Sequence, residues 1–467
     1  MYGPNVASDT GGPTESGPLA ASSTGPFDPE AGLTDLSRQA LAELGREYLL
    51  LGHLLDRVGM PLVVERFGGE AQLRLAIDEW MAASPVYSKR MQRALRFEGD
   101  DVATVFKNLQ LDIGAPPQFM DFQFRLDGPE YGEFWLDHCG ALMDVEPWGE
   151  TAVRRMCHDI EDPTFDATAA ATNPHMVMRP IHRPPRTPAD RHPHCRWKVF
   201  VDEDATAADP HPDLDVVASS LVATVGLDLP EGGGRPDAGG LADYSGPFLP
   251  DLQLEDLSHR ALLVVTQEAA VQAHLLVRSF LLAVDRRFGP EAAATIGRRQ
   301  WTGSAAVDAH RLRRALGLEH RDDIDAVARV VQLHPHFLPR TYVDLGLVVT
   351  GERSARLTLG PAPAFAEGDA HSWFAGLDRA PHPALDAMVG AVNPRAQCLP
   401  VDAPASGHLA WDIVIDPAAE PRDDPPELGL ARISVGADFE LTPRRPLPLP
   451  VPVSVEPAPV SIESGRP

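Results

Sequence analysis

Apolar residues follow a helical period in the first part of the chain. Residues 33–57 and 69–95 carry apolar side chains at spacings of three and four, which predicts two long amphipathic helices. Pro85 falls inside the second helix and is expected to interrupt or kink it, because proline lacks the amide hydrogen that a helix interior uses. A third, shorter helix is predicted over residues 100–111.

The period then changes from helical to alternating. Residues 119–126 and 131–139 alternate between apolar and polar positions on either side of an Asp-Gly pair, which is typical of a β-hairpin. Two further strands are predicted at 176–182 and 194–202, with helices between the two strand pairs. Helices followed by a small antiparallel sheet with inserted helices define an α+β fold class.

The same series of motifs occurs twice. Trp80 recurs as Trp301, and the motif Arg-Phe-Gly-x-Glu-Ala that begins at Arg66 recurs at Arg287, both at an offset of 221 residues. Later Asn-Pro and His-x-x-Trp motifs recur at offsets of 220 and 214, and the changes of offset fall in predicted loops. The sequence therefore predicts two tandem homologous copies. We expect them to pack as an intramolecular pseudo-two-fold pair, as when a homodimer-forming unit duplicates, with further homo-oligomerisation left open.

Composition sets the boundaries between these copies. The ends and the middle of the chain are rich in Gly, Pro, Ser and acidic residues, which favours disordered or linking segments. The predicted segments are a disordered tail at 1–30, a first copy at 31–203 that is expected to be active, an acidic Gly/Pro linker at 204–250, a degenerate second copy at 251–418 and an extended, poorly packed Pro-rich tail at 419–467.

Charge excludes several classes of partner. The chain has 41 Lys and Arg against 67 Asp and Glu, a net charge of −26. Such a surface repels phosphate backbones and anionic lipid, so neither nucleic acid nor a membrane surface is expected as a partner. The N-terminus does not resemble a signal peptide, and no uninterrupted apolar run reaches the roughly 18 residues of a membrane span. A cytoplasmic location is the expectation.

Four cysteines are too few for a disulfide scaffold, and none forms a Cys-x-x-Cys pair. Their distribution between the copies is unequal. Cys157 aligns with Leu377, Cys195 aligns with Leu409, and Cys139 falls near Gly360. One interpretation is that the thiols are small apolar core residues, because free cysteine packs as such. The other is that the first copy uses them in an active site.

The neighbours of Cys157 favour a site. The segment from Cys157 to Asp166 is acidic, and Cys157 and Glu161 share a helix face. The candidate catalytic residues are thiols, a histidine and acids: Cys157, His158, Asp159, Asp166, Cys139 and Cys195. Asp166 recurs as Asp386, so it also has a structural interpretation.

Acids alone would raise the pKa of a thiol, so the site needs cations. The candidates are Arg179, His182, Arg183 and Arg186, which would also hold a substrate carboxylate. The alternative for this group is a solvated loop stiffened by proline. The thiols themselves could act as covalent catalysts on an sp² carbon, or bind Zn or Fe through Cys139, Cys157 and Cys195.

The first copy resembles the L-2-amino-thiazoline-4-carboxylic acid hydrolase-like family, which is related to the vinyl-reductase-type fold. The matching features are the Phe-Gly-x-Glu-Ala motif at Phe67, Cys139 near a strand end, Cys157 in a helix with Asp159, and Cys195 in a Cys-x-aromatic strand. The resemblance covers residues of about 33–203 and implies ring-opening hydrolysis of a small cyclic C–N or C–S substrate, with these cysteines at the site.

Three functions follow from these observations. The leading hypothesis is a hydrolase-like enzyme, or a lyase, that acts on a small cyclic amidine, thiazoline or amide through the cysteines of the first copy. The second is a small-ligand or metal sensor or carrier that uses the same cysteines without turnover. The third is a structural protein whose cysteines fill the core.

Overall fold

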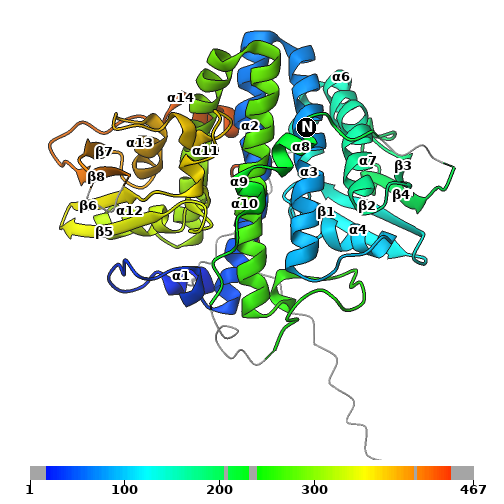
Figure 1. Ribbon diagram of the computed structural model, residues 1–467, viewed down its shortest axis with the longest axis horizontal. Coiled ribbons are helices and arrows are strands. Elements are labelled where there is room, and N and C mark those ends of the chain that lie inside the picture. Colours follow the sequence, from blue (N-terminus) through cyan, green and yellow to red (C-terminus); the bar gives the residue numbers. More distant parts are fainter. Residues whose placement is uncertain (1–16, 205–208, 231–238, 404–407, 443–467) are drawn as a thin grey trace, which may run out of the picture.

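The computed structural model describes residues 17–204, 209–230, 239–403 and 408–442. Within them, the expected order of helices followed by a small sheet occurs twice, which confirms the α+β fold class (Figure 1). Each half has its own four-stranded antiparallel sheet, and the long helices lie between the two sheets. Among the described helices, none is long and apolar enough to cross a membrane.

Two long helices open the first half. Ser37 begins α2 (Arg38–Phe67) by accepting a hydrogen bond from the Ala40 amide, and Gly68 ends it. Gly68 has a φ of +85°, which suits glycine and turns the chain into α3 (Gly69–Ala94). α3 runs through Pro85 without a break, so Pro85 does not interrupt the helix, and the predicted alternative, a kink, stays a prediction. The turns on both sides of Pro85 are buried, and this packing holds the helix together.

After α4 (Val102–Leu109) the first sheet begins. Its order is β1-β2-β4-β3, and its strands coincide with the predicted ones to within a residue at each end. The bounds are β1 (Met120–Leu126), β2 (Tyr131–Cys139), β3 (Met176–His182) and β4 (Cys195–Val201). Between β2 and β3 lie α5 (Gly140–Val145), α6 (Glu150–Arg154), a π-helical segment Arg155–Ile160 and α7 (Glu161–Thr172). α6, the π-helical segment and α7 follow one another without a loop.

The second half repeats this plan. Its helices are α10 (His259–Phe288), α11 (Pro290–Ala315), α12 (Ile324–Gln332) and α13 (Pro383–Gly390). Its strands are β5 (Leu345–Gly351), β6 (Ser354–Leu359), β7 (Ala396–Val401) and β8 (Leu409–Ile415), in the equivalent order β5-β6-β8-β7. Even the register matches, since Phe134 pairs with Trp197 and Leu357 pairs with Trp411.

Side-chain contacts also recur at corresponding positions. Asp166 accepts a hydrogen bond from the Met178 amide at 3.1 Å, and its counterpart Asp386 accepts one from the Cys398 amide at 2.8 Å. The amide of Asn173 donates to the Asp100 carbonyl as that of Asn393 donates to the Asp322 carbonyl. These shared hydrogen bonds therefore connect α7 and α13 to the sheet of their own half. They also connect the turn after each helix to the residue that precedes α4 or α12.

The four long helices hold the halves together through reciprocal contacts. Arg90 of α3 pairs with Glu268 of α10 at 2.7 Å, and their counterparts Arg311 and Glu47 pair at 2.8 Å. All four side chains are largely buried. In a two-fold interface, a contact of one residue with another implies the reverse contact in the partner. The arrangement is the one expected of a pseudo-two-fold pair.

Segments expected to be tails or linkers contain packed structure. In the predicted linker, α8 (Leu214–Ala218) and α9 (Leu221–Thr224) pack on the long helices, and in the predicted Pro-rich tail α14 (Pro426–Ala431) does so. α1 (Pro18–Ser22) lies within the predicted disordered tail and packs on α2. The predicted boundaries were wrong for these helices because local composition does not reveal tertiary burial. The parts of these predicted segments at 1–16, 205–208, 231–238 and 443–467 lie outside the described residues.

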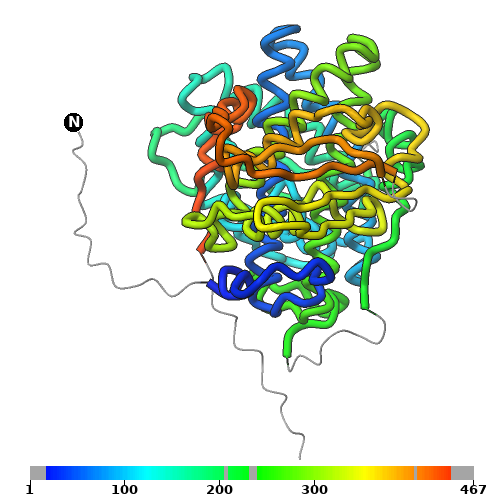
Figure 2. The backbone as a smooth tube through the Cα atoms, turned by 90° about the vertical axis from the view of Figure 1, so that its left-hand side faces the viewer, coloured from blue at the N-terminus to red at the C-terminus, as the bar shows by residue number. Residues whose placement is uncertain are grey.

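The last described segment returns to the first half. Ser434 and Val435 donate hydrogen bonds to the carboxylate of Asp144, both at 2.8 Å, and Thr442 bonds to Gln118. Figure 2 shows this red segment beside the part of the first half that contains residues of about 140–190. The two halves are therefore joined by crossing segments as well as by the bundle.

Candidate functional site

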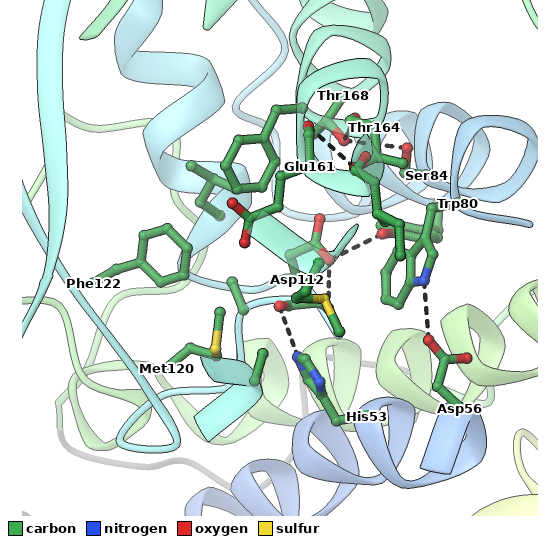
Figure 3. Close-up of a pocket in the computed structure, with 18 of the residues that line it drawn as sticks. His53, Asp56, Trp80, Ser84, Asp112, Met120, Phe122, Glu161, Thr164 and Thr168 are labelled. Carbon is green, nitrogen blue, oxygen red and sulfur yellow. Dashed lines mark hydrogen bonds between the residues drawn. The ribbon is translucent and has the colours of Figure 1, made fainter. Parts of the chain in front are cut away.

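A cavity of about 110 Å³ lies inside the first half. α2, α3, the loop after α4, β1, the π-helical segment and α7 all contribute to its wall. Its lining contains acids, hydroxyl groups and apolar side chains, as Figure 3 shows. Since one water molecule needs about 10–15 Å³ measured in this way, the cavity has room for several waters or a small organic molecule.

Glu161, the first residue of α7, points its carboxyl group into the space near Phe122 and Asp112 (Figure 3). Burial raises its pKa to about 8, although the nearby Arg183 acts in the opposite direction. This carboxyl group forms no hydrogen bond or ion pair with any other residue that the structure describes. A largely buried acid without a partner is costly, so Glu161 is the strongest candidate for a group that meets a ligand.

Asp112 lies on another wall of the same cavity and is held firmly. The Tyr87 hydroxyl donates to it at 3.0 Å, and the Gly114 amide donates at 2.7 Å. Burial raises its pKa to about 6, while these two hydrogen bonds act to lower it. The two acids therefore have different pKa values in one cavity, with Asp112 ionising before Glu161 as the pH rises.

The wall formed by α2 and α3 contains a second pair of acids. Trp80 donates its indole N–H to Asp56 at 3.1 Å, and Glu79 is buried near Asp56 with neither carboxyl oxygen hydrogen-bonded to a described residue. Burial raises the pKa of both acids, and the nearby Asp56 raises that of Glu79 further. His53 bonds to the Gly114 carbonyl at 3.0 Å, and burial lowers its pKa to about 4. His53 is thus neutral near pH 7.

A larger hollow of about 680 Å³ adjoins the cavity on the outside. Asp56, Arg57, Trp80, Met156 and Ile160 line both spaces. The hollow also has an apolar rim of exposed side chains, namely Val64, Trp148 and Ile433. A ligand that enters through the hollow would pass these apolar groups before it reached the acids.

Arg57 lines both spaces, and the last described segment of the chain helps to hold it there. Its Nε donates to Asp144 at 2.6 Å, and Asp144 accepts from Ser434 on the crossing segment. The first-half site is therefore completed by residues from the far end of the sequence.

The three cysteines come together behind the cavity wall. Charge on either Cys139 or Cys195 would raise the pKa of Cys157, which places the three thiols within electrostatic reach of one another. The Cys139 thiol lies 3.6 Å from the sulfur of Met120, which lines the cavity. None of the thiols lines the cavity itself.

All three thiols are held in the neutral form. Burial raises the pKa of Cys139 to about 12, and burial together with Glu161 raises those of Cys157 and Cys195 well above the ordinary value. Arg183 lowers the pKa of Cys157, but less than burial raises it. Since the thiolate is the nucleophile, this environment does not activate a cysteine.

The three predicted arginines form ion pairs with acids of the protein. Arg179 pairs with Asp166 at 2.7 Å and Arg186 pairs with Glu146 at 2.8 Å. Arg183 pairs with Asp162 and lies over the Trp197 ring. Of the four cations predicted, only Arg183 lies close enough to the thiols to affect them.

The other predicted site residues lie outside the cavity. His158 bonds to the Pro184 carbonyl at 2.7 Å, Asp159 is exposed, and His182 stands on β3 opposite Arg196. Asp166 makes the same strand contact as Asp386, which gives it a structural role.

Sequence reasoning missed most of the cavity. Glu161 was noted only as a neighbour of Cys157, and Asp56 and Asp112 were not singled out. Comparison of the two halves could have found all three acids, because Val277, His334 and Pro381 occupy their columns in the second half. These acids differ between the two halves in the same way as the cysteines do.

The group of potential metal ligands that lie close together contains none of the predicted cysteines. Among the described residues, the group of histidines, cysteines and acids whose ligand atoms all lie within 4.8 Å of one another is Asp308, His334 and His336, in the second half. Comparison of the chain with known protein families, with curated proteins and with solved structures gave no match.

Proposed function

We propose that the first half is the catalytic half of a hydrolase-like enzyme for a small amidine, thiazoline or amide. The observation that carries this proposal is the unpartnered Glu161 carboxyl group, which faces a cavity and has a pKa of about 8. A pair of acids whose pKa values differ within one site is the arrangement that acid–base catalysis requires.

The two acids would divide the work of hydrolysis. Near pH 7, ionised Asp112 would take a proton from water as its oxygen forms a bond to the sp² carbon. Neutral Glu161 would give its proton to the ring nitrogen as the C–N bond breaks. The proton on Asp112 and the negative charge on Glu161 then cancel on proton exchange with solvent, so the enzyme returns to its starting state. Neither step needs a thiolate.

The lining of the cavity and of the outer hollow favours a substrate with one polar end and one apolar end. The acids at the inner cavity favour a cationic or hydrogen-bond-donating group such as an amidine, and the hydroxyl groups of Thr164, Thr168 and Ser84 add polar contacts. The apolar rim of the outer hollow favours an apolar substituent. The resemblance to a thiazoline hydrolase family points to the same type of ring, although its cysteine chemistry is replaced here by acid–base chemistry.

The test is turnover of a panel of small cyclic amidines, thiazolines and amides, followed by product analysis. The wild-type protein should open at least one ring, and Glu161→Gln should lower kcat by about 10²–10⁴. Glu150→Gln is the matched control, because Glu150 is an exposed acid of the same helical region. Equal turnover in Glu161→Gln and the wild type would contradict the proposal.

A second candidate is a carrier or sensor that binds the same molecules without turnover. The neutral, buried thiols favour it, because they give the cavity no covalent nucleophile. Saturable binding of a panel member that yields no product, lost in Glu161→Gln, would select the carrier over the enzyme.

A further inference from the structure

We infer that the second half holds a divalent transition-metal ion between Asp308, His334 and His336. Asp308 lies on α11, and the two histidines follow α12 as a His-Pro-His sequence. Their ligand atoms lie within 4.8 Å of one another, and their exposed fractions are 1%, 0% and 2%. Two imidazoles and one carboxylate form a ligand set that suits zinc or iron(II) rather than calcium or magnesium.

Unsatisfied atoms in this cluster point to a missing partner. Nε2 of His336 lies 2.8 Å from Oδ2 of Asp308, yet neither atom has a hydrogen-bond partner of good geometry among the described residues. The other Asp308 oxygen is buried and unpartnered as well. Buried polar atoms almost always have partners, and a cation among them would supply one.

The surroundings orient one of the histidines for a metal. Nε2 of His334 donates to the Ala305 carbonyl at 3.2 Å, and Nδ1 accepts the His336 amide at 3.4 Å, so an ion bound at Nδ1 would replace that longer hydrogen bond. Histidine ligands of metals are commonly fixed by such a hydrogen bond from the other ring nitrogen.

For His336, the Trp301 indole donates to Nδ1 at 3.2 Å, so the proton of the neutral ring is on Nε2. An ion bound at Nε2 replaces that proton, and uptake of the metal therefore releases protons to solvent.

The first half shows that these residues are not part of the common scaffold. Tyr87, Asp112 and Gly114 occupy the corresponding columns, and there the Tyr87 hydroxyl simply bonds to Asp112. Three separate differences at these columns have produced two imidazoles and a carboxylate in contact. The metal site and the first-half cavity thus occupy equivalent places in the two halves, and the metal inference does not depend on the catalytic proposal.

The test uses the full chain after treatment with a chelator, titrated with Co²⁺ and with Zn²⁺. We expect uptake of one equivalent, release of protons, and a cobalt spectrum without a thiolate charge-transfer band. Asp308→Asn and His336→Gln should each weaken the affinity by more than about tenfold, because even outer partners of a ligand commonly contribute that much.

The matched control is the triple variant Cys139→Ser, Cys157→Ser and Cys195→Ser, which should keep the full affinity. A thiolate band, loss of uptake in the triple variant, or absence of saturable uptake by the wild type would each overturn the inference. The wild-type spectrum and the triple variant decide the question even if the variants at the buried site do not fold.

Discussion

Phe67 and Phe288 stack on each other with ring centroids 3.7 Å apart and planes 4° from parallel. Each is the last residue of the first long helix of its half, and the two occupy the same column of the repeated motif. A residue that meets its own counterpart must lie beside the axis of a two-fold arrangement. This contact therefore marks the position of the pseudo-two-fold axis near the Gly68 and Gly289 turns.

Removal of either ring should weaken the bundle by a similar amount. We expect a double-mutant cycle of Phe67→Ala and Phe288→Ala to give a coupling free energy of about 0.5–1.5 kcal/mol, as for other aromatic pairs. The measurement is the free energy of unfolding in urea. A coupling energy of zero would show that the two rings do not stabilise each other in solution.

The reciprocal ion pairs give a second measure of the symmetry. Glu47→Gln and Glu268→Gln each leave a buried arginine without its charged partner, so each should lower the free energy of unfolding by about 3–5 kcal/mol. Exposed Glu70→Gln is the control and should change it by less than about 1 kcal/mol. A large effect at only one of the two buried positions would mean that the halves do not share the interface equally.

Glu161 should make the protein less stable as the pH rises. Its pKa is about 8 in the folded chain and near 4.5 in the unfolded chain, so the folded state retains the proton between these values. Stability from this group is present below pH 4.5 and is lost as the pH rises toward 8. Thermal unfolding of the wild type relative to Glu161→Gln should show a difference that grows by at most about 1.4 kcal/mol per pH unit. A difference that is independent of pH would contradict the raised pKa.

The pH dependence of turnover should be bell-shaped. Activity requires ionised Asp112 and neutral Glu161, so kcat/KM should rise near pH 6 and fall near pH 8. Asp112→Asn should abolish activity, whereas Cys157→Ser should leave both limbs unchanged. If the limbs of the pH profile shift in the Cys157 variant, the thiol takes part in the reaction and the acid–base proposal is wrong.

The thiols should resist modification while the protein is folded. Cys139, Cys157, Cys195 and Cys398 are all buried with raised pKa values, so few thiolates are present at pH 7.5. A thiol-reactive dye should label none of them quickly in buffer and all four in guanidinium chloride. Rapid labelling of Cys157 in the folded protein would show an activated nucleophile.

Local patterns predicted most of the first half's framework. The hairpin and the two later strands follow from alternation of period two and from an Asp-Gly turn, both of which act between near neighbours. The helix caps at Ser37 and Ser258 and the turns at Gly68 and Gly289 are local in the same way. The packing of α14 was not predictable, because its six residues are stabilised by α2 and α11 rather than by their own sequence.

The sequence placed the candidate site in the half that contains the cavity, but for an indirect reason. Unequal cysteines pointed to the first half, and the cavity does lie there, but the thiols stand behind its wall. The acids that face it come from α2, the loop after α4 and α7, which are separated by tens of residues. No short motif joins Asp56, Asp112 and Glu161, so only the folded chain shows that they share a cavity.

The crossing of the last described segment to Asp144 has a consequence for synthesis of the protein. A ribosome completes residues 38–201 long before it reaches Ser434, so the first half emerges without the residues that fix Asp144 and Arg57. The hydrogen bond between Ser434 and Asp144 can therefore form only after the second half has been made. A chain that stopped before residue 434 would contain Asp56, Asp112 and Glu161 without the segment that holds Asp144 beside Arg57.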